Sequence, residues 1–210
     1  MCSPKGPIIG PLVITGILVE ESRVHELKEI GVKDSKLVEP KNREKLYKAI
    51  LNIIEDYKVI IIPPKEIDEA VLSKENNLNK LEAQKAAEII QYLKPNKVIM
   101  DCPSTNIKAY TEYLKSLITI KPELVLEHKA DLNNVEVGAA SIISKYIREE
   151  EIKKLKEKIK EDFGSGYPSD PYTQEFIKKN FKKHADIMRK SWQTYKNLIK
   201  GEKQNKLNNY

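Results

Sequence analysis

Residues 97–106, KVIMDCPSTN, decide the fold class of this 210-residue chain. Their first five residues form an apolar, β-branched run that predicts a buried strand ending at Asp101. A segment of similar design, LVLEHKAD at 124–131, predicts a second strand leading to Asp131. Open α/β sheets bind their ligands beyond the carboxyl ends of their strands. We therefore expect the two aspartates to lie at one edge of a sheet.

Strand and helix patterns alternate through the rest of the chain, which is typical of the α/β class. Further strands are expected at 12–19 (LVITGILV) and 58–62, the latter stopped by Pro63 and Pro64. Helical patterns cover parts of 22–57, then 78–93, 137–164, 170–184 and 186–200, followed by a polar tail that is expected to fray. These patterns predict a mixed sheet flanked by helices, with a C-terminal helical extension.

Composition limits the classes of function. The 37 Lys and Arg residues against 31 Asp and Glu give a net charge of +6, which modestly favours polyanionic partners but also fits an ordinary lysine-rich surface. No stretch reads as a membrane span or signal peptide, and Cys2 and Cys102 are too few for a disulfide framework. We expect a cytoplasmic protein.

Asp101 and Asp131 are the first candidates for chemistry. Converging carboxylates repel each other, and bound Mg²⁺ or Mn²⁺ relieves that repulsion. Hard oxygen ligands of this kind suit metal-assisted phosphoryl transfer. The alternative is that both residues are loop aspartates that cap turns.

Three further motifs carry candidate binding residues. The sequence KDSK at 33–36 places two lysines and a serine where they can grip phosphate, or it is ordinary surface charge. The sequence GSGYPSDP at 164–171 is a rigid turn that displays Tyr167 for stacking on a sugar or base, or it connects two helices. The sequence RKSWQT at 189–194 offers Arg189, whereas Trp192 is more typical of a core.

Taken together, the motifs resemble a known family. GPIIGPLVITG, GVKDSK, NLNKLEA, DCPSTN, EHKAD, GAASIISK, GSGYPSDP and RKSWQT occur in this order in type 2 ribonuclease H, and the chain is most similar to archaeal ribonuclease HII from about residue 6 to 196. The resemblance implies an RNase H-like α/β catalytic domain at 1–150 and a C-terminal helical substrate-binding region at 151–210. It also implies an endonuclease that cuts the RNA strand of RNA–DNA hybrids and ribonucleotides embedded in DNA.

The resemblance assigns roles to individual residues. It implies that Asp101 and Asp131 are catalytic ligands of Mn²⁺ or Mg²⁺, and that Tyr167 packs on the deoxyribose at the RNA-to-DNA junction. The remaining substrate-binding residues that it implies are Lys5, Gly6, Lys33, Asp34, Ser35, Lys36, Ser141, Lys145 and Arg189. The enzyme is expected to be a monomer, and a contact with a replication clamp stays open.

The first residues depart from the family pattern. The family has a strand ending in Asp-Glu-Ala-Gly-Arg-Gly-Pro, and this chain has Met-Cys-Ser-Pro-Lys-Gly-Pro at 1–7. A thioether and a thiol stand where two carboxylates are expected, and both are poor ligands for Mg²⁺. Val135 and Glu136 replace a common Tyr-Pro. We therefore expect weak metal affinity and a large loss of rate. The family's first strand is central in its sheet, and we expect its absence here to reflect either a start further upstream or a degenerate homologue.

Three other functions stay open at this stage. The chain could bind RNA–DNA hybrids without cutting them, as a catalytically inactive homologue. It could also be a basic structural protein with no role in nucleic-acid metabolism. A thiol activity through Cys2 and Cys102 is the weakest of these hypotheses, because no base lies near either residue in the sequence.

Overall fold

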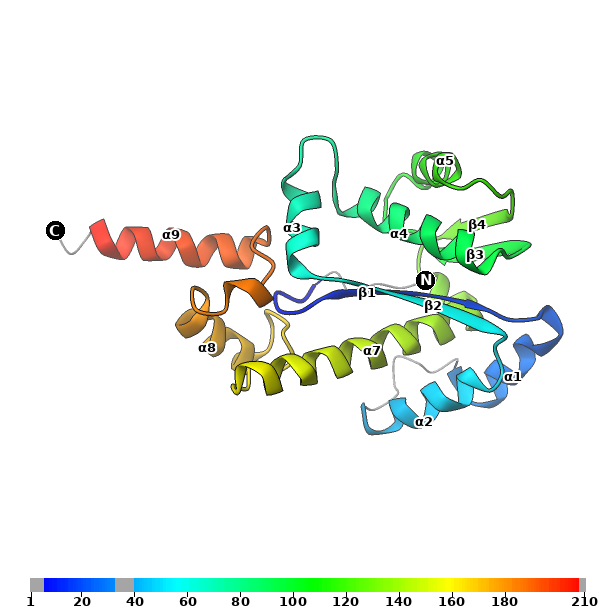
Figure 1. Cartoon of the computed structure of the whole chain (residues 1–210), viewed down its shortest axis with the longest axis horizontal. Helices are drawn as coiled ribbons and strands as arrows, with labels where there is room; N and C mark the ends of the chain where they lie inside the picture. The colour runs from blue at the N-terminus through cyan, green and yellow to red at the C-terminus, as the bar shows by residue number, and fades with distance from the viewer. Residues whose placement is uncertain (1–5, 33–39, 208–210) are drawn as a thin grey trace. The chain divides into compact units, whose positions relative to one another are not determined.

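The computed structural model of the chain describes residues 6–32 and 40–207 (Figure 1). No helix within these ranges is long and apolar enough to cross a membrane. The elements, in chain order, are β1 (Leu12–Leu18), η1 (Glu21–Arg23), α1 (Val24–Glu29), α2 (Pro40–Leu51), β2 (Asp56–Ile62), α3 (Pro64–Leu72), α4 (Leu78–Leu93), β3 (Lys97–Asp101), α5 (Ile107–Leu117), β4 (Glu123–Glu127), α6 (Ala130–Asn133), α7 (Val135–Ile159), α8 (Pro171–Asn180), η3 (Ala185–Ile187) and α9 (Gln193–Leu207).

The described chain forms two compact units. The first contains Val13–Ile61 and Asn79–Ile147, and the second contains Ile62–Leu78, the chain from Arg148 onward and the short segment up to Leu12. The boundary near residue 147 lies within α7. The domain division at residue 150 that the sequence suggests stays a prediction.

The first unit confirms the α/β class. Its strands form two two-stranded sheets among the described residues, β1 with β2 and β3 with β4. Strands β3 and β4 are parallel, with Lys97 opposite Glu123 and Asp101 opposite Glu127. The predicted mixed sheet is thus present as two separate pairs in this part of the chain.

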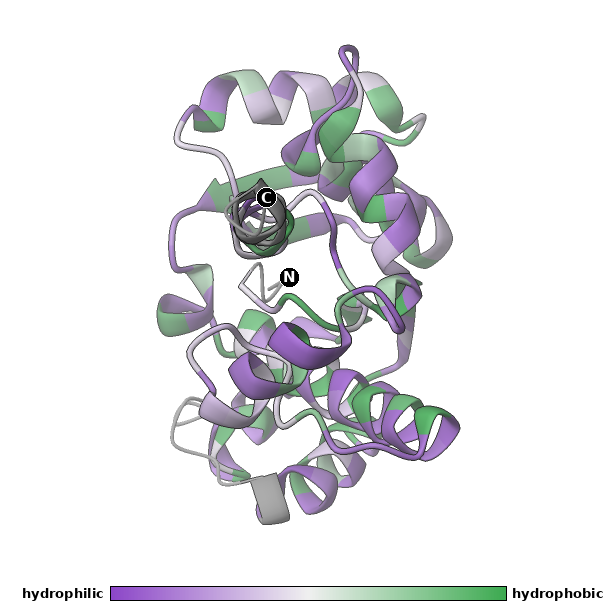
Figure 2. Cartoon of the chain, turned by 90° about the vertical axis from the view of Figure 1, so that its left-hand side faces the viewer, coloured by the Kyte–Doolittle hydropathy of each residue, from purple (hydrophilic) through white to green (hydrophobic). Residues whose placement is uncertain are grey.

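Two apolar clusters hold helices in the first unit. Met100 of β3 packs with Tyr110 and Leu114 of α5 and with the alanine-rich face of α4. Leu27 of α1 and Ile50 of α2 pack against the start of α7. Helices that bury one face carry both hydrophobic and hydrophilic residues along their length, as Figure 2 shows.

The second unit folds around residues 8 and 9. Ile8 and Ile9 are fully buried in a cluster with Phe163, Phe176 and Met188. Ile9 also forms an antiparallel bridge with Met188. This bridge explains why the helix expected at 186–200 begins only at Gln193: the backbone around Met188 is extended and pairs with another segment. The same helix continues to Leu207, beyond the start of the expected frayed tail.

The other boundaries differ less from the sequence pattern. Helix α7 ends at Ile159, before the expected residue 164, and Lys160 follows in the left-handed region with φ of 56°. The expected strand at 124–131 ends at Glu127, and its last residues form α6. Helices α3 and α5 are additional elements that the sequence patterns did not predict.

Gly16 of β1 allows a close approach of α4. A Cβ atom at this position would lie 2.3 Å from Cγ2 of Ile89 and 3.2 Å from Cδ1 of Leu93. A contact of 2.3 Å between carbon atoms requires the helix or the strand to move, because packed interiors leave little free space. Glycine is therefore the residue that this strand–helix contact requires.

We predict that Gly16→Ala lowers the free energy of unfolding by about 1–3 kcal/mol, the usual effect of overpacking. Adding Ile89→Leu removes Cγ2 and should restore part of the loss. Gly201→Ala is the control, because nothing lies within 4 Å of a Cβ there and alanine in a helix is up to about 1 kcal/mol better than glycine. Urea unfolding measures all four proteins; a Gly16→Ala variant as stable as the parent would contradict the packing.

Candidate active site

Asp101 and Asp131 lie at the carboxyl end of the parallel β3–β4 pair. Asp101 is the last residue of β3, and its Oδ1 accepts a hydrogen bond of 2.7 Å from the backbone N–H of Lys129. Lys129 has a φ of 57°, and this left-handed residue turns the chain from β4 into α6, the short helix that carries Asp131. Both aspartates are half-buried. The structure therefore brings together the two elements that carry them, as the sequence predicted.

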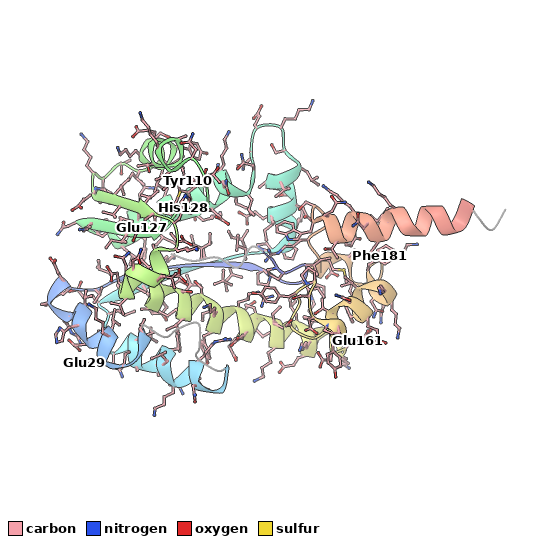
Figure 3. The ribbon with its side chains drawn as sticks, turned by 180° about the vertical axis from the view of Figure 1, so that it is seen from behind. Glu29, Tyr110, Glu127, His128, Glu161 and Phe181 are labelled. Atoms are coloured by element: carbon pink, nitrogen blue, oxygen red, sulfur yellow. The ribbon has the colours of Figure 1, made fainter. Side chains whose placement is uncertain are left out.

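A network of hydrogen bonds fixes this turn. The backbone N–H of Cys102 donates to the carbonyl of Glu127 at 2.9 Å, which extends the strand pairing by one bond. Asn134 donates from its backbone to the carbonyl of Ala130 at 2.8 Å, and its side-chain amide donates to the Glu127 carboxylate. Nδ1 of His128 lies 3.3 Å from the Cys102 carbonyl oxygen, which can only accept. Glu127 and His128 mark this end of β4 in Figure 3.

Sequence reasoning missed Glu127, Lys129 and Asn134 as parts of this site. Glu127 stands opposite Asp101 in the strand register, so both strands end in an acidic residue. The acidic residue at the end of both strands is the sequence feature that could have identified Glu127 as part of the site. Lys129 acts through its backbone and Asn134 through its amide, and neither role leaves a pattern in the sequence.

Helix α7 carries two predicted substrate contacts. Gly138 brings the helix near the turn: a Cβ there would lie 3.6 Å from the carbonyl oxygen of Asp131. Ser141 is only 1% exposed, and its hydroxyl has no hydrogen-bond partner among the described residues. Lys145, one helical turn further, is half-buried. The helix thus supplies a polar side chain to the interior and a cation nearer the surface.

The donor set limits which metal centre this site could hold. No group of three or more His, Cys, Asp or Glu residues suited to a metal occurs within the described ranges. One oxygen of Asp101 is already engaged by Lys129. Mg²⁺ often binds through one or two carboxylates together with water and substrate phosphate. The described carboxylates therefore form no group of three or more that could hold a metal ion, and Asp101 and Asp131 are the two acidic residues at this strand end that could take part in binding one together with substrate phosphate.

The second unit holds the turn that displays Tyr167. The guanidinium carbon of Arg148 lies 4.9 Å from the centroid of the Tyr167 ring, a cation–π distance. Arg148 is buried and donates from Nη2 to the carbonyls of Ser165 at 3.2 Å and Ile9 at 3.4 Å. Burial lowers the pKa of Arg148, whereas its electrostatic interaction with the Tyr167 side chain acts in the opposite direction. A Cβ at Gly6 would lie 3.7 Å from the same ring.

Asp170 closes this turn and caps the next helix. Its carboxylate accepts hydrogen bonds from the backbone N–H of Ser165 at 2.6 Å, the Ser165 hydroxyl at 2.7 Å and the backbone N–H of Tyr172 at 3.0 Å. These donors lower the pKa of Asp170 from 3.8 to about 2, with the Ser165 backbone as the largest cause. Thr173 ties the turn internally, because it accepts from Gly166 and donates to Phe163.

The structure places Arg189 differently from the sequence expectation. Its side chain is fully buried, and it donates to the carbonyls of Gly10 at 3.2 Å and Pro11 at 2.8 Å. The following residues are held by Asp68, whose carboxylate accepts from Ser191 and from the backbone of Lys190. Arg189 therefore positions the segment before β1 and does not face solvent. Arginine suits this task because its planar group carries five donors.

Several predicted contacts lie outside the described residues. They are Lys5, Lys33, Asp34, Ser35 and Lys36. Gly6 is described and exposed.

Comparison with known proteins agrees with these motifs. The sequence profile of the family described as ribonuclease HII matches residues 4–195. Ribonuclease HII of Pyrococcus horikoshii is 40% identical over 208 residues, which cover 97% of this chain and 92% of the relative. The crystal structure of ribonuclease H2 from P. horikoshii OT3 is similar at a TM-score of 0.84 and 39% identity, covering 94% of each chain. The structure of the PCNA:RNase HII complex from Archaeoglobus fulgidus is similar at a TM-score of 0.83 and 37% sequence identity, covering 93% of each chain.

We predict that the charge of Asp170 stabilises the fold at neutral pH. Because the folded pKa is depressed, the contribution is fully present above the ordinary value of 3.8 and is lost as the pH falls toward about 2. Asp170→Asn keeps a helix-capping side chain and removes the charge. Its melting temperature should lie below that of the parent at pH 7, with the gap narrowing between pH 4 and pH 2. The exposed Asp186, changed to Asn, is the control; a gap that stays constant down to pH 2 would contradict the prediction.

Proposed function

The chain belongs to the ribonuclease HII family, and from this premise we propose that it cuts the RNA strand of RNA–DNA hybrids and single ribonucleotides embedded in DNA. It is a hydrolase of the ribonuclease H class. Hydrolysis of the phosphodiester by water leaves a 5′-phosphate and a 3′-hydroxyl. The observation that carries the proposal is the position of Asp101 and Asp131 at the carboxyl end of one parallel strand pair.

We propose that these two aspartates are the catalytic residues. When bound, Mg²⁺ or Mn²⁺ supplies an activated water and neutralises phosphate charge. Asp101 and Asp131 would hold such an ion together with the substrate phosphate. The backbone N–H of Lys129 holds the Asp101 carboxylate in one orientation through Oδ1. The direction of the second oxygen of Asp101 is therefore set by the fold.

We assign recognition of the RNA-to-DNA junction of the substrate to the second unit. The Tyr167 ring rests on the buried Arg148, and the Ser165–Asp170 bonds hold its loop, so the ring is presented from a rigid base. A rigid aromatic face suits packing on a deoxyribose or base. We assign the chain from residue 151 onward to substrate binding, with Arg189 as a positioning residue.

The remaining contacts serve the phosphate backbone. The substrate contacts that we propose are Gly6, Ser141 and Lys145, together with Lys5, Lys33, Asp34, Ser35 and Lys36, which lie outside the described residues. When lysines neutralise phosphates, the binding affinity decreases as the salt concentration rises. A replication clamp is a further proposed partner, because the A. fulgidus relative was solved in a complex with PCNA.

A hybrid-binding protein without nuclease activity is the second candidate. The observation that favours it is the lack of a third metal-binding carboxylate, His or Cys beside the two aspartates in the described chain. Recognition through Tyr167 and the lysines needs no metal. The two candidates differ only in whether a bound hybrid is cut.

We predict that Asp101→Asn and Asp131→Asn each abolish cleavage of a duplex with one embedded ribonucleotide. Loss of a metal-ion contribution of several kcal/mol corresponds to at least about a 100-fold lower rate. The assay uses a Mn²⁺ series, with Asp186→Asn as the control and circular dichroism to check folding. Retained cleavage in both variants would exclude the aspartates as catalytic residues. Tight binding without cleavage by the parent chain would favour the second candidate.

We predict that Tyr167→Ala weakens binding to the same duplex, whereas Tyr167→Phe keeps the ring and binds within about threefold of the parent. Stacking of one ring is worth about 1–3 kcal/mol, so the alanine variant should lose roughly 5- to 150-fold in affinity. Tyr172 is 75% exposed and five residues away, which makes Tyr172→Ala the matched control. Fluorescence anisotropy measures each dissociation constant; equal losses for both alanine variants would argue against a specific role of Tyr167.

A further inference from the structure

The helix that carries Asp131, α6, is too short to hold itself in place. It spans Ala130–Asn133 and closes with one turn, in which the backbone N–H of Asn134 donates to the Ala130 carbonyl at 2.8 Å. Helices shorter than about 12–15 residues are marginal in water on their own. The residue before α6, Lys129, is left-handed, a conformation that costs lysine free energy. The position of Asp131 therefore depends on contacts that α6 makes with other elements.

The two paired strands each supply a carboxylate to one end of α6. Asp101 closes β3 and accepts from the backbone N–H of Lys129, the residue before α6, at 2.7 Å. Glu127 closes β4 (Figure 3), and its Oε1 accepts from the side-chain amide of Asn134, the residue after α6. Asp101 and Glu127 stand opposite each other in the strand register. The strand pair thus holds α6 at both ends, with Asp131 between them.

Asn134 joins three elements of the site. Its Nδ2 donates to Glu127 of β4 and, at 3.2 Å, to the carbonyl of Ala130 in α6. Its backbone carbonyl accepts from the N–H groups of Val137 and Gly138, each at 3.1 Å, in the first turn of α7. A carboxylate and a carbonyl oxygen can only accept, so the amide uses both of its N–H groups here. Asn134 therefore fixes where α6 ends and where α7 begins.

The two ends of β4 carry glutamates in different settings. Glu127 and Asn134 are half-buried, and a hydrogen bond to an ionised carboxylate is roughly twice as strong as one between neutral groups. Glu123, at the other end of the strand, is exposed and pairs with Lys97 of β3 at 3.3 Å. Exposed ion pairs of that kind contribute little to stability. Glu123 is therefore a matched comparison for Glu127.

We propose that Glu127 and Asn134 form a positioning pair, which holds α6 so that the Asp131 carboxylate keeps its place relative to Asp101. The pair acts through the backbone of α6 and not on the reacting atoms. The inference rests on the proposed nuclease function, because the place of Asp131 matters for catalysis only if it helps to hold a metal ion. Mg²⁺ demands near-ideal octahedral geometry. A loosened α6 should therefore impair activity with Mg²⁺ more than activity with the larger Mn²⁺.

The variants separate the hydrogen bond from the charge. Glu127→Ala removes the acceptor, whereas Glu127→Gln removes the charge and keeps an accepting oxygen. Asn134→Asp keeps the shape of the side chain but sets a second acceptor against Glu127. Glu127→Gln combined with Asn134→Asp reverses donor and acceptor at unchanged net charge, and it restores the bond between the two side chains but not the one to Ala130. Glu123→Ala is the control on the same strand.

The first measurement is hydrogen exchange of the Leu132 amide, followed by NMR on the whole chain without metal. This N–H donates to the carbonyl of Lys129 at 2.9 Å, across the start of α6. Exchange should be at least about tenfold faster in Glu127→Ala and in Asn134→Asp, because local opening of α6 becomes easier. Glu127→Gln and Glu123→Ala should exchange like the parent, and the double variant should lie between the two groups.

The second measurement is cleavage of a duplex with one embedded ribonucleotide, in Mg²⁺ and in Mn²⁺. Glu127→Ala and Asn134→Asp should lower kcat with Mg²⁺ at least about tenfold and leave KM within about twofold, as expected for an interaction needed only in the transition state. The loss with Mn²⁺ should be smaller. Glu127→Gln should stay within about threefold of the parent, and the double variant should recover part of the loss.

Each other outcome overturns the proposal. Slower cleavage by Glu127→Ala without faster exchange at Leu132 would make Glu127 a direct ligand. Faster exchange with an unchanged kcat would leave the pair a purely structural role. Parent-like behaviour of Glu127→Ala in both measurements would leave it no role in the site.

A parent chain that cuts with neither ion would contradict the nuclease function itself. The affinity for Mn²⁺ alone, measured by electron paramagnetic resonance, then decides the positioning role. Binding at least about fivefold weaker in Glu127→Ala than in the parent and in Glu123→Ala would support it. Equal affinities in all three proteins would overturn it.

Discussion

The parallel pairing of β3 and β4 is the constraint on which the candidate active site depends. Parallel strands end at the same edge of a sheet, so the residues that follow both strands must share one space. The register sets Asp101 opposite Glu127, and a slip of one residue would turn Asp101 to the other face. The hydrogen bond from Lys129 to Asp101 then fixes the turn that leads to Asp131. Two short strands and one left-handed residue thus place both carboxylates.

In the second unit, buried arginine side chains hold the backbone in place, as strand pairing does in the first unit. Arg148 and Arg189 both donate to carbonyl groups of residues 9–11, a segment with little regular structure of its own. Buried carbonyls without donors would be costly, and a planar guanidinium can serve several at once. Arg148 also supports the Tyr167 ring. The same cation therefore orders the segment before β1 and supports the aromatic ring.

The sequence predicted the local features of the site better than its long-range ones. The strand patterns before Asp101 and Asp131 and the glycine-rich turn around Tyr167 depend on neighbouring residues, and such patterns can be read directly. The burial of Arg189 depends on carbonyl groups at residues 10 and 11, far away in the sequence. The late start of α9 has the same origin, because Ile9 pairs with Met188. Partners remote in sequence decide these features, and periodicity carries no information about them.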